Sequence, residues 1–174
     1  MSKEKQVKFL KIYEPVHGSF ERFCRARAYG DTDYKDLIND TLLIAFQKFE
    51  SLKSKEAFLS FLFSIAVRIL ANNKRKKKES SDSFEYHSSF YQDINAQTSA
   101  DTEVYLLHKA LKMIPDDQRE CIILFEISGM DIKEIAVIQA TSESNVKQRL
   151  KRGREKLRKV LNFESVYQRG DIAV

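Results

Sequence analysis

The sequence has few residues that break helices, form disulfides or bind metals: its 174 residues include five Gly, two Pro, two Cys and three His. Cys24 and Cys121 lie far apart in apolar surroundings and no Cys-x-x-Cys spacing occurs, so we expect two reduced thiols, no metal site and no cofactor. No run of about 18 apolar residues is present, which argues against a transmembrane helix or direct membrane insertion. The charged N-terminus lacks a signal-peptide core, and together these features predict a cytoplasmic protein.

Apolar residues recur at helical spacing along most of the chain, and the alternation of β-branched residues that is typical of strands is absent. We expect helices over 7–28, interrupted near Pro15, over 33–50 and over 57–77. The segment 79–101 is rich in Ser, Asp, Asn and Gln, and this composition is typical of a flexible linker. The sequence therefore predicts an all-α chain with two small helical domains, 1–78 and 102–162, and a C-terminal tail, 163–174.

Positive charge is concentrated in two places. The net charge is +5, yet the segment 142–161 carries +6 and the run KRKKK at 74–78 carries +5, so the rest of the chain is acidic. Clustered basic residues of this kind are the electrostatic signature of a nucleic-acid-binding protein. Solubility alone does not require such clustering.

The second domain has the pattern of a helix-turn-helix. Gly129 suits the left-handed position after a helix, and Asp131 with Glu134 forms a capping-box pattern. Ser142 is the expected N-cap of the last helix. The helices are expected over 103–113, 116–128, 132–139 and 142–161. A short helix, a tight turn and a longer helix together predict that the longer helix enters the DNA major groove.

The last helix divides into an inward and an outward face. Val146 and Leu150 are expected to pack on the domain, and the side chains expected to point outward are those of Asn145, Lys147, Gln148, Lys151 and Arg152. Gln and Asn can pair with adenine, and Lys and Arg with guanine. Phosphate contacts or solvation are expected for Arg149, Arg154, Lys156 and Arg158.

The sequence of this helix fits a coiled coil or a membrane-surface helix less well. A coiled coil needs about three heptads and this stripe lasts barely two. A membrane-surface helix needs bulky aromatic residues, which 142–161 lacks. A solvated structural helix remains open.

The segment 114–161 resembles region 4 of the sigma-70 family of transcription initiation factors, and most closely that of the extracytoplasmic function (ECF) group. The resemblance is carried by Ile114-Pro115, Arg119, Gly129, Glu134-Ile135-Ala136 and Val146-Lys147-Gln148-Arg149-Leu150. The segment DYKDLINDTLLIAFQKFESLKSKEAFLSFLFSIAVRILANNKRKKK is similar to region 2. The resemblance covers roughly residues 7–161 and implies a region 2 helical bundle and a region 4 helix-turn-helix.

The resemblance implies a role for the first predicted domain in binding the β′ clamp of core RNA polymerase. The family motif is Asp-Leu-x-Gln-Glu, and here it is Asp36-Leu37-Ile38-Asn39-Asp40, with two shorter side chains. The implied core-binding residues are Asp36, Leu37, Asn39 and Asp40. An acidic face suits a basic partner, although these acids could also only solvate the helix.

The resemblance also implies contacts with the two promoter elements. The loop 52–56 would capture a flipped base of the −10 element. The helix after it would follow the strands near the start of melting, with Phe61 and Arg68 where the family often has Trp and Asn. The implied −10 residues are Leu52, Lys53, Ser54, Lys55, Phe61 and Arg68. The implied −35 residues are Ser144, Asn145, Lys147, Gln148, Arg149, Lys151 and Arg152.

Three positions depart from the region 4 pattern. Ala140 replaces the turn Gly, at a cost of about 1 kcal/mol if φ is positive there. Glu143 follows the N-cap, and Ser144-Asn145 replaces a common Gly-Thr.

Taken together, these patterns predict an ECF-type sigma factor that is not an enzyme. The implied partners are core RNA polymerase through its β′ clamp and β flap, promoter DNA and an anti-sigma factor. The alternatives are a stand-alone helix-turn-helix repressor or activator, which would typically dimerise on a palindrome, and an adaptor that does not bind DNA.

Overall fold

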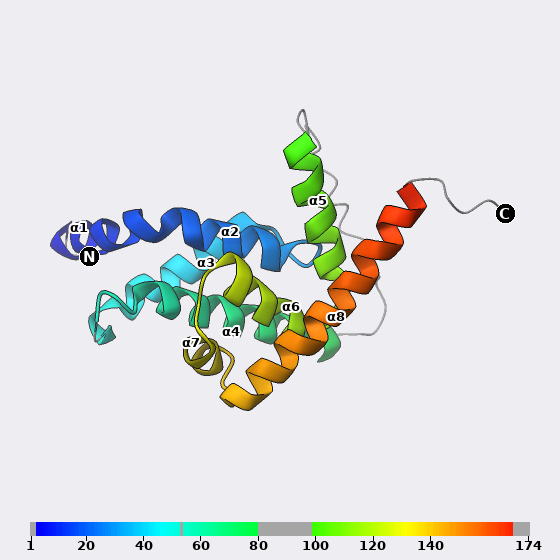
Figure 1. The fold of residues 1–174 in the computed structure, drawn as a ribbon. Coiled ribbons are helices and arrows are strands. Elements are labelled where there is room, and N and C mark those ends of the chain that lie inside the picture. The colour runs from blue at the N-terminus through cyan, green and yellow to red at the C-terminus, as the bar shows by residue number, and fades with distance from the viewer. Residues whose placement is uncertain (1–2, 53, 80–98, 169–174) are drawn as a thin grey trace.

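The computed structural model describes residues 3–52, 54–79 and 99–168, and within these ranges every regular element is helical (Figure 1). The prediction of an all-α fold is confirmed. The elements are α1 Lys3–Tyr13, the 3-10 turn η1 Glu14–Val16, α2 His17–Ala28, α3 Tyr34–Gln47, the 3-10 turn η2 Phe49–Ser51, α4 Phe58–Glu79, α5 Ser99–Lys112, α6 Asp116–Ile122, the π-helical turn η3 Ile123–Ile127, α7 Ile132–Ile138 and α8 Glu143–Gln168. The predicted linker lies almost entirely outside the described residues.

The first half of the chain is a bundle built around aromatic side chains. Asp33 caps α3 by accepting a 2.7 Å hydrogen bond from the backbone N–H of Lys35, which explains where this helix begins. Phe9 of α1 meets three other phenylalanine rings edge to face, with centroids 5.3 to 5.5 Å apart. These rings attach α1 to α3 and α4, so the face of α3 on the far side is left to solvent.

The second half contains the expected helix-turn-helix, and its local signals are in place. Gly129 has φ +70°, and the capping box of Asp131 and Glu134 forms at the start of α7. Ala140 has φ 48°, so the turn between α7 and α8 has a left-handed residue that is not Gly. Gly153 lets α8 approach α6, because a Cβ there would lie 2.8 Å from Ile122 Cδ1.

Helix α8 is longer than the sequence pattern indicated. The apolar stripe was expected to stop the helix at 161, yet α8 continues to Gln168. Neither Gly nor Pro occurs between 154 and 169, so nothing in this segment breaks a helix that is already nucleated. The first residues of the predicted C-terminal tail therefore continue α8.

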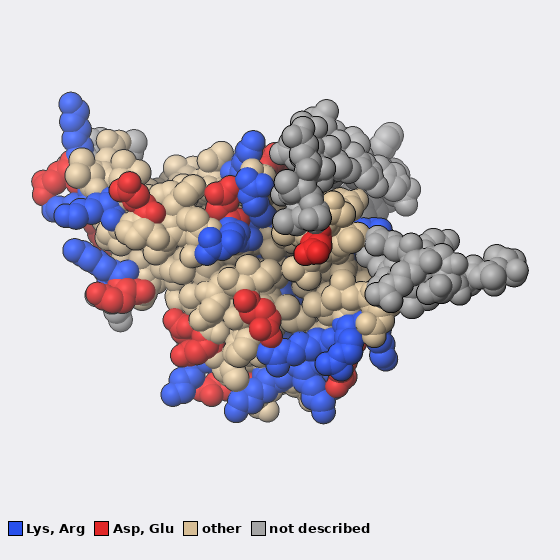
Figure 2. All heavy atoms as spheres, turned by 45° about the horizontal axis from the view of Figure 1, so that its top comes forward, with Lys and Arg blue, Asp and Glu red and all other residues tan. Residues whose placement is uncertain are grey.

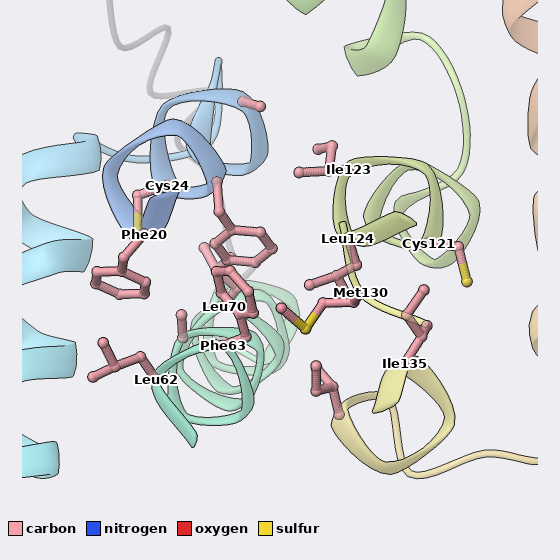
Figure 3. Close-up of a cluster of buried hydrophobic side chains, with 14 of the residues drawn as sticks. Phe20, Cys24, Leu62, Phe63, Leu70, Cys121, Ile123, Leu124, Met130 and Ile135 are labelled. Atoms are coloured by element: carbon pink, nitrogen blue, oxygen red, sulfur yellow. The ribbon is translucent and has the colours of Figure 1, made fainter. Parts of the chain in front are cut away.

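The two halves pack against each other around a single hydrophobic core (Figure 3). α4 lies against α7, and α2 lies against η3. Met130, between η3 and α7, reaches toward Phe63 and Leu70 of α4, and its sulfur lies 3.6 Å from Ser60 Oγ. The two predicted helical domains therefore share one core, which brings the predicted DNA-reading surfaces of both halves into one compact body.

Candidate nucleic-acid interface

The start of α8 is fixed by its cap and by two buried side chains. Ser142 Oγ accepts a 3.2 Å hydrogen bond from the backbone N–H of Asn145, as expected for an N-cap. Val146 and Leu150 are buried against the domain. The rest of this first part of the helix is consequently held out toward solvent in a defined rotation.

The outward face has a neutral strip between two basic flanks. At about 100° per residue, the uncharged Ser144 and Gln148 lie opposite the buried stripe and form this neutral strip, and the acidic Glu155 follows two turns later on the same face. The exposed residues on one flank are Lys147, Lys151, Arg154 and Arg158, and those on the other are Arg152, Lys156 and Lys159. Figure 2 shows Lys and Arg gathered over the surface that α8 forms. A helix with this cross-section suits a major groove, where phosphates lie on both sides of the base edges.

Two of the predicted −35 residues make contacts within the protein. Arg149 donates a 2.8 Å hydrogen bond from Nη1 to Gln139 Oε1, and its Nε lies 3.1 Å from Asp117 Oδ2. Asn145 Nδ2 donates to Thr141 Oγ1 at 3.1 Å. Within the part of the chain that the structure describes, no side-chain hydrogen bond or ion pair engages the other five members of the set, all exposed, which are Ser144, Lys147, Gln148, Lys151 and Arg152.

Gln139 is a residue that the sequence analysis missed. Its Nε2 donates to Glu120 Oε1 at 2.8 Å and to the backbone O of Asp117 at 3.1 Å, while its Oε1 accepts from Arg149 and from Cys121 Sγ. Burial raises the pKa of the Cys121 thiol to about 12, so it remains a neutral donor. A Gln at the end of a short helix has no sequence signature that would have revealed this role.

On α3, three of the four predicted polymerase-binding residues share an exposed face. Asp36, Asn39 and Asp40 are exposed, whereas Leu37 is only 2% exposed and packs in the core. The prediction of a direct contact through Leu37 therefore does not fit the structure, because its position in the helix turns it inward. Leu43 is 59% exposed and lies one turn after Asp40 on the same face, a position the sequence analysis overlooked.

The predicted −10 residues lie before and along α4. Leu52 is half-buried, Lys55 is exposed, and Ser54 Oγ donates to Glu56 Oε2, while Lys53 lies outside the described residues. Phe61 is partly exposed, with its ring centroid 6.4 Å from that of Phe58. Arg68 is exposed two turns further along the same face of α4 as Phe61. The structure thus places Phe61 and Arg68 on one face of α4, with Phe61 partly exposed and Arg68 exposed.

Neither a metal centre nor a membrane span is evident in the described part of the chain. Over residues 3–52, 54–79 and 99–168, no three His, Cys, Asp or Glu side chains gather as metal ligands would. Over the same ranges, no helix combines the length and the apolar character that crossing a bilayer requires.

Comparison with known proteins gives consistent matches. Residues 105–157 match the family described as "Sigma-70, region 4". The ECF RNA polymerase sigma factor EcfG of Rhodopseudomonas palustris is 28% identical over 128 residues, which cover 72% of this chain and 70% of the relative. The ECF RNA polymerase sigma factor SigM of Mycobacterium tuberculosis is 23% identical over 158 residues, which cover 89% of this chain and 78% of the relative.

Two solved structures have the same fold. The sigma factor RpoE from Bartonella quintana, in complex with the anti-sigma factor NepR, matches with a TM-score of 0.67 at 25% identity, over 92% of this chain and 98% of that chain. CnrH, in complex with the cytosolic domain of CnrY, matches with a TM-score of 0.67 at 22% identity, over 90% of this chain and 89% of that chain.

Proposed function

We propose that this chain is a member of the sigma-70 family, in its ECF group, and that it binds core RNA polymerase and directs transcription initiation from promoters with −35 and −10 elements. The observation that carries the proposal is α8, whose neutral strip lies between two basic flanks and whose rotation is fixed by Val146 and Leu150. The function is recognition and assembly, with no catalytic step assigned to this chain.

We assign −35 recognition to the exposed start of α8. Gln148, on the neutral strip, can pair with an adenine edge, and Lys151 or Arg152 with guanine. Lys147, Lys156 and Lys159 are assigned to phosphates, which position the helix and carry no sequence information. Arg149 and Asn145 are assigned to the same DNA-facing surface, with their side chains positioned by hydrogen bonds to Gln139 and Thr141, respectively.

We assign polymerase binding to the exposed face of α3. Asp36 and Asp40 provide negative charge for a basic partner, and Leu43 adds apolar area at the end of the same face. The partner surface is the clamp of the β′ subunit, with the β flap as the site for the second domain. One solved neighbour, RpoE, is a complex with the anti-sigma factor NepR, and we propose a partner of that class here as well.

We assign −10 recognition to the loop around 52–56 and to α4. Phe61 offers a ring for stacking on an extruded base, and Arg68 offers a donor to phosphate or guanine on the same face. Because RNA polymerase acts on chromosomal DNA, the proposed function places the protein in the cytoplasm.

The test is binding to polymerase and DNA in separate steps. The protein should bind purified core polymerase, and promoter DNA should be bound tightly and specifically only by that complex. Tight binding to a palindromic operator by the protein alone, with no affinity for core polymerase, would overturn the proposal in favour of a repressor or activator.

A further inference from the structure

A cavity of about 590 Å³ lies beside the C-terminal part of α4, next to α5 and the turn between α2 and α3. Its volume is in the range of pockets that hold small molecules. The cationic side chains that line it are those of Arg27, Lys74, Lys76, Lys77 and Lys112. The acidic residues among the described residues of its lining are Asp31 and Asp116, so five cations face two acids and the wall has an excess of three positive charges. The cavity therefore favours an anionic ligand.

The two acidic residues are each shared between several cations. Asp31 accepts a hydrogen bond from Lys112 and another, of 2.5 Å, from Arg119 Nη2. Asp116 lies 2.6 Å from Lys74 Nζ and 2.9 Å from Arg119 Nη2. Arg119 is fully buried behind this wall, and its Nε and Nη1 have no hydrogen-bond partner within the described residues. The carboxylates at the cavity thus leave part of the positive charge without a counterion, and an added anion would supply one.

Two pKa values show that the cations of this cluster repel one another. Burial, with a further contribution from Arg27, lowers the pKa of Arg119 to about 10. Burial, with a further contribution from Arg119, lowers the pKa of Lys112 below its ordinary value. An anion bound among these groups would favour their charged forms and reduce the repulsion.

The turn between α2 and α3 helps to place one of the cations. Gly30 has φ +71°, and a Cβ added to it would lie 3.3 Å from Lys112 Cε. The absence of a side chain leaves room for the stem of Lys112 to cross the turn, and its ammonium group reaches Asp31. Because this side chain is already ordered, it loses less conformational entropy on binding an anion than a free surface lysine would.

The excess charge of the wall matches a diphosphate better than a single phosphate. A terminal phosphate carries about −1.5 to −2 at pH 7, and a second phosphate in the same chain adds about one more negative charge. The three lysines of α4 lie on one side of the cavity and Lys112 of α5 on another, so two linked phosphates can engage cations from both helices.

The shape and the neutral residues of the cavity suit a small molecule. Duplex DNA can reach the exposed Lys76, but it cannot reach Arg27, which is 6% exposed. Leu70 is 7% exposed and offers an apolar contact, while Thr32 and Asn73 offer a hydroxyl and an amide. These three residues can contact the part of a ligand that is not phosphate.

We propose that this cavity is a binding site for a small molecule that carries a diphosphate, either as free pyrophosphate or as part of a nucleotide. The lysines of α4 and Lys112 bind the phosphates, and Leu70 and Asn73 contact the remainder of a nucleotide. The lining residues are distinct from those assigned to polymerase or to the two promoter elements. The inference therefore goes beyond the proposed function and does not depend on it.

Isothermal titration calorimetry of the full chain measures this binding without polymerase or DNA. Pyrophosphate should bind at a single site, and inorganic phosphate and AMP should bind about tenfold or more weakly, because each engages fewer cations. ADP that binds more tightly than pyrophosphate would identify a nucleotide as the ligand, and ADP that binds no more tightly would identify the inorganic diphosphate. No binding of pyrophosphate or ADP, or equal binding of inorganic phosphate, would refute the proposal.

A pair of charge variants separates a defined site from general attraction to a basic protein. Lys76→Gln should weaken pyrophosphate binding about fivefold or more. Lys11→Gln removes the same charge at an exposed position of α1 and should leave the affinity unchanged. Lys76 is exposed, with no side-chain hydrogen bond or ion pair within the described residues, so its replacement should preserve the fold. Equal effects of the two variants would show that the attraction is diffuse.

A pair of neutral variants locates the site in the cavity. Asn73→Trp places a bulky side chain in the cavity lining, whereas Asn72→Trp places it at the neighbouring exposed position of α4, outside that lining. Asn73→Trp should weaken pyrophosphate binding about tenfold or more, and Asn72→Trp should bind like the wild type. Circular dichroism should show equal helical content in both. Undiminished binding by Asn73→Trp would place the anion elsewhere and contradict the assignment.

Discussion

Arg149 of the recognition helix and Gln139 of the preceding turn are joined by a hydrogen bond of 2.8 Å between Nη1 and Oε1. The same Gln139 amide donates to Glu120, which in turn accepts from Arg27 of the first half. A continuous set of polar contacts therefore runs from Arg27 of the first half to the DNA-reading surface of α8. Loss of Arg27 would free one oxygen of Glu120 and alter the support of Gln139.

Gln139→Ala should weaken both the second domain and −35 recognition. It leaves Glu120 Oε1 and the Arg149 guanidinium each short of a partner, and such losses cost about 1–3 kcal/mol when the groups are buried. Chemical denaturation measures the stability and fluorescence anisotropy of the holoenzyme measures DNA affinity. Gln6→Ala, at an exposed position of α1, is the control. Full stability with unchanged affinity would mean that Gln139 is dispensable.

Gln148→Ala and Lys156→Ala should have different effects on DNA binding. Removing a base-reading side chain should cost about 1–3 kcal/mol and relax preference at one position of the −35 element. Removing a phosphate contact should weaken binding to all promoter sequences equally. It should also reduce the slope of log affinity against log salt concentration by about 1. Titrations against a panel of singly substituted promoters at several salt concentrations separate the two. Identical profiles for both variants would contradict the division of the helix into strip and flanks.

Leu37→Ala and Asp40→Ala should separate stability from polymerase binding. Leu37 is a core residue, so its truncation should cost about 2–5 kcal/mol of unfolding free energy. Asp40 is exposed, so its loss should leave stability nearly unchanged and lower affinity for core polymerase. Thermal denaturation and polymerase titration are the two measurements. An Asp40→Ala protein with normal affinity, alone and combined with Asp36→Ala, would remove the assignment of this face.

His108 should make the stability of the fold depend on pH. Burial, with a further contribution from Arg25, lowers the pKa of His108 below its ordinary 6.5, and its ring lies 5.7 Å from that of Tyr29 in the first half. Unfolding exposes His108 and restores its ordinary pKa, so the unfolded state binds the proton more readily. The contribution of neutral His108 to the free energy of unfolding is therefore complete above pH 6.5 and decreases as the pH falls below it. The free energy of unfolding, measured by chemical denaturation between about pH 8 and about pH 5, should fall on acidification. His108→Gln should make this fall smaller while exposed His17 remains; a fall of equal size in that variant would assign it to another group.

Features specified by neighbouring residues were predictable from the sequence. The capping box of Asp131 and Glu134, the left-handed Gly129 and the inward Val146 each depend on a pattern of a few positions. The turn Ala140 was also identified as a possible site of positive φ, and it has φ 48°. Such local chemistry leaves a direct trace in the order of residues.

Features that depend on distant residues were not predictable. Arg27 and Glu120 are 93 positions apart, and nothing near either residue indicates the other. Gly153 has no local conformational requirement, and only the structure reveals the side chain of Ile122 above it. Many contacts of this kind together determine how the two halves dock. The sequence pattern therefore predicted the helices of each half but not how the halves pack together.

The central claim is promoter-specific initiation, and run-off transcription on genomic fragments with mapping of the 5′ ends tests it most directly. Core polymerase with this protein should yield a set of start sites that share two upstream elements at fixed separation, and Gln148→Ala should selectively lose those that depend on the upstream one. Start sites identical to those of core polymerase alone would contradict the account.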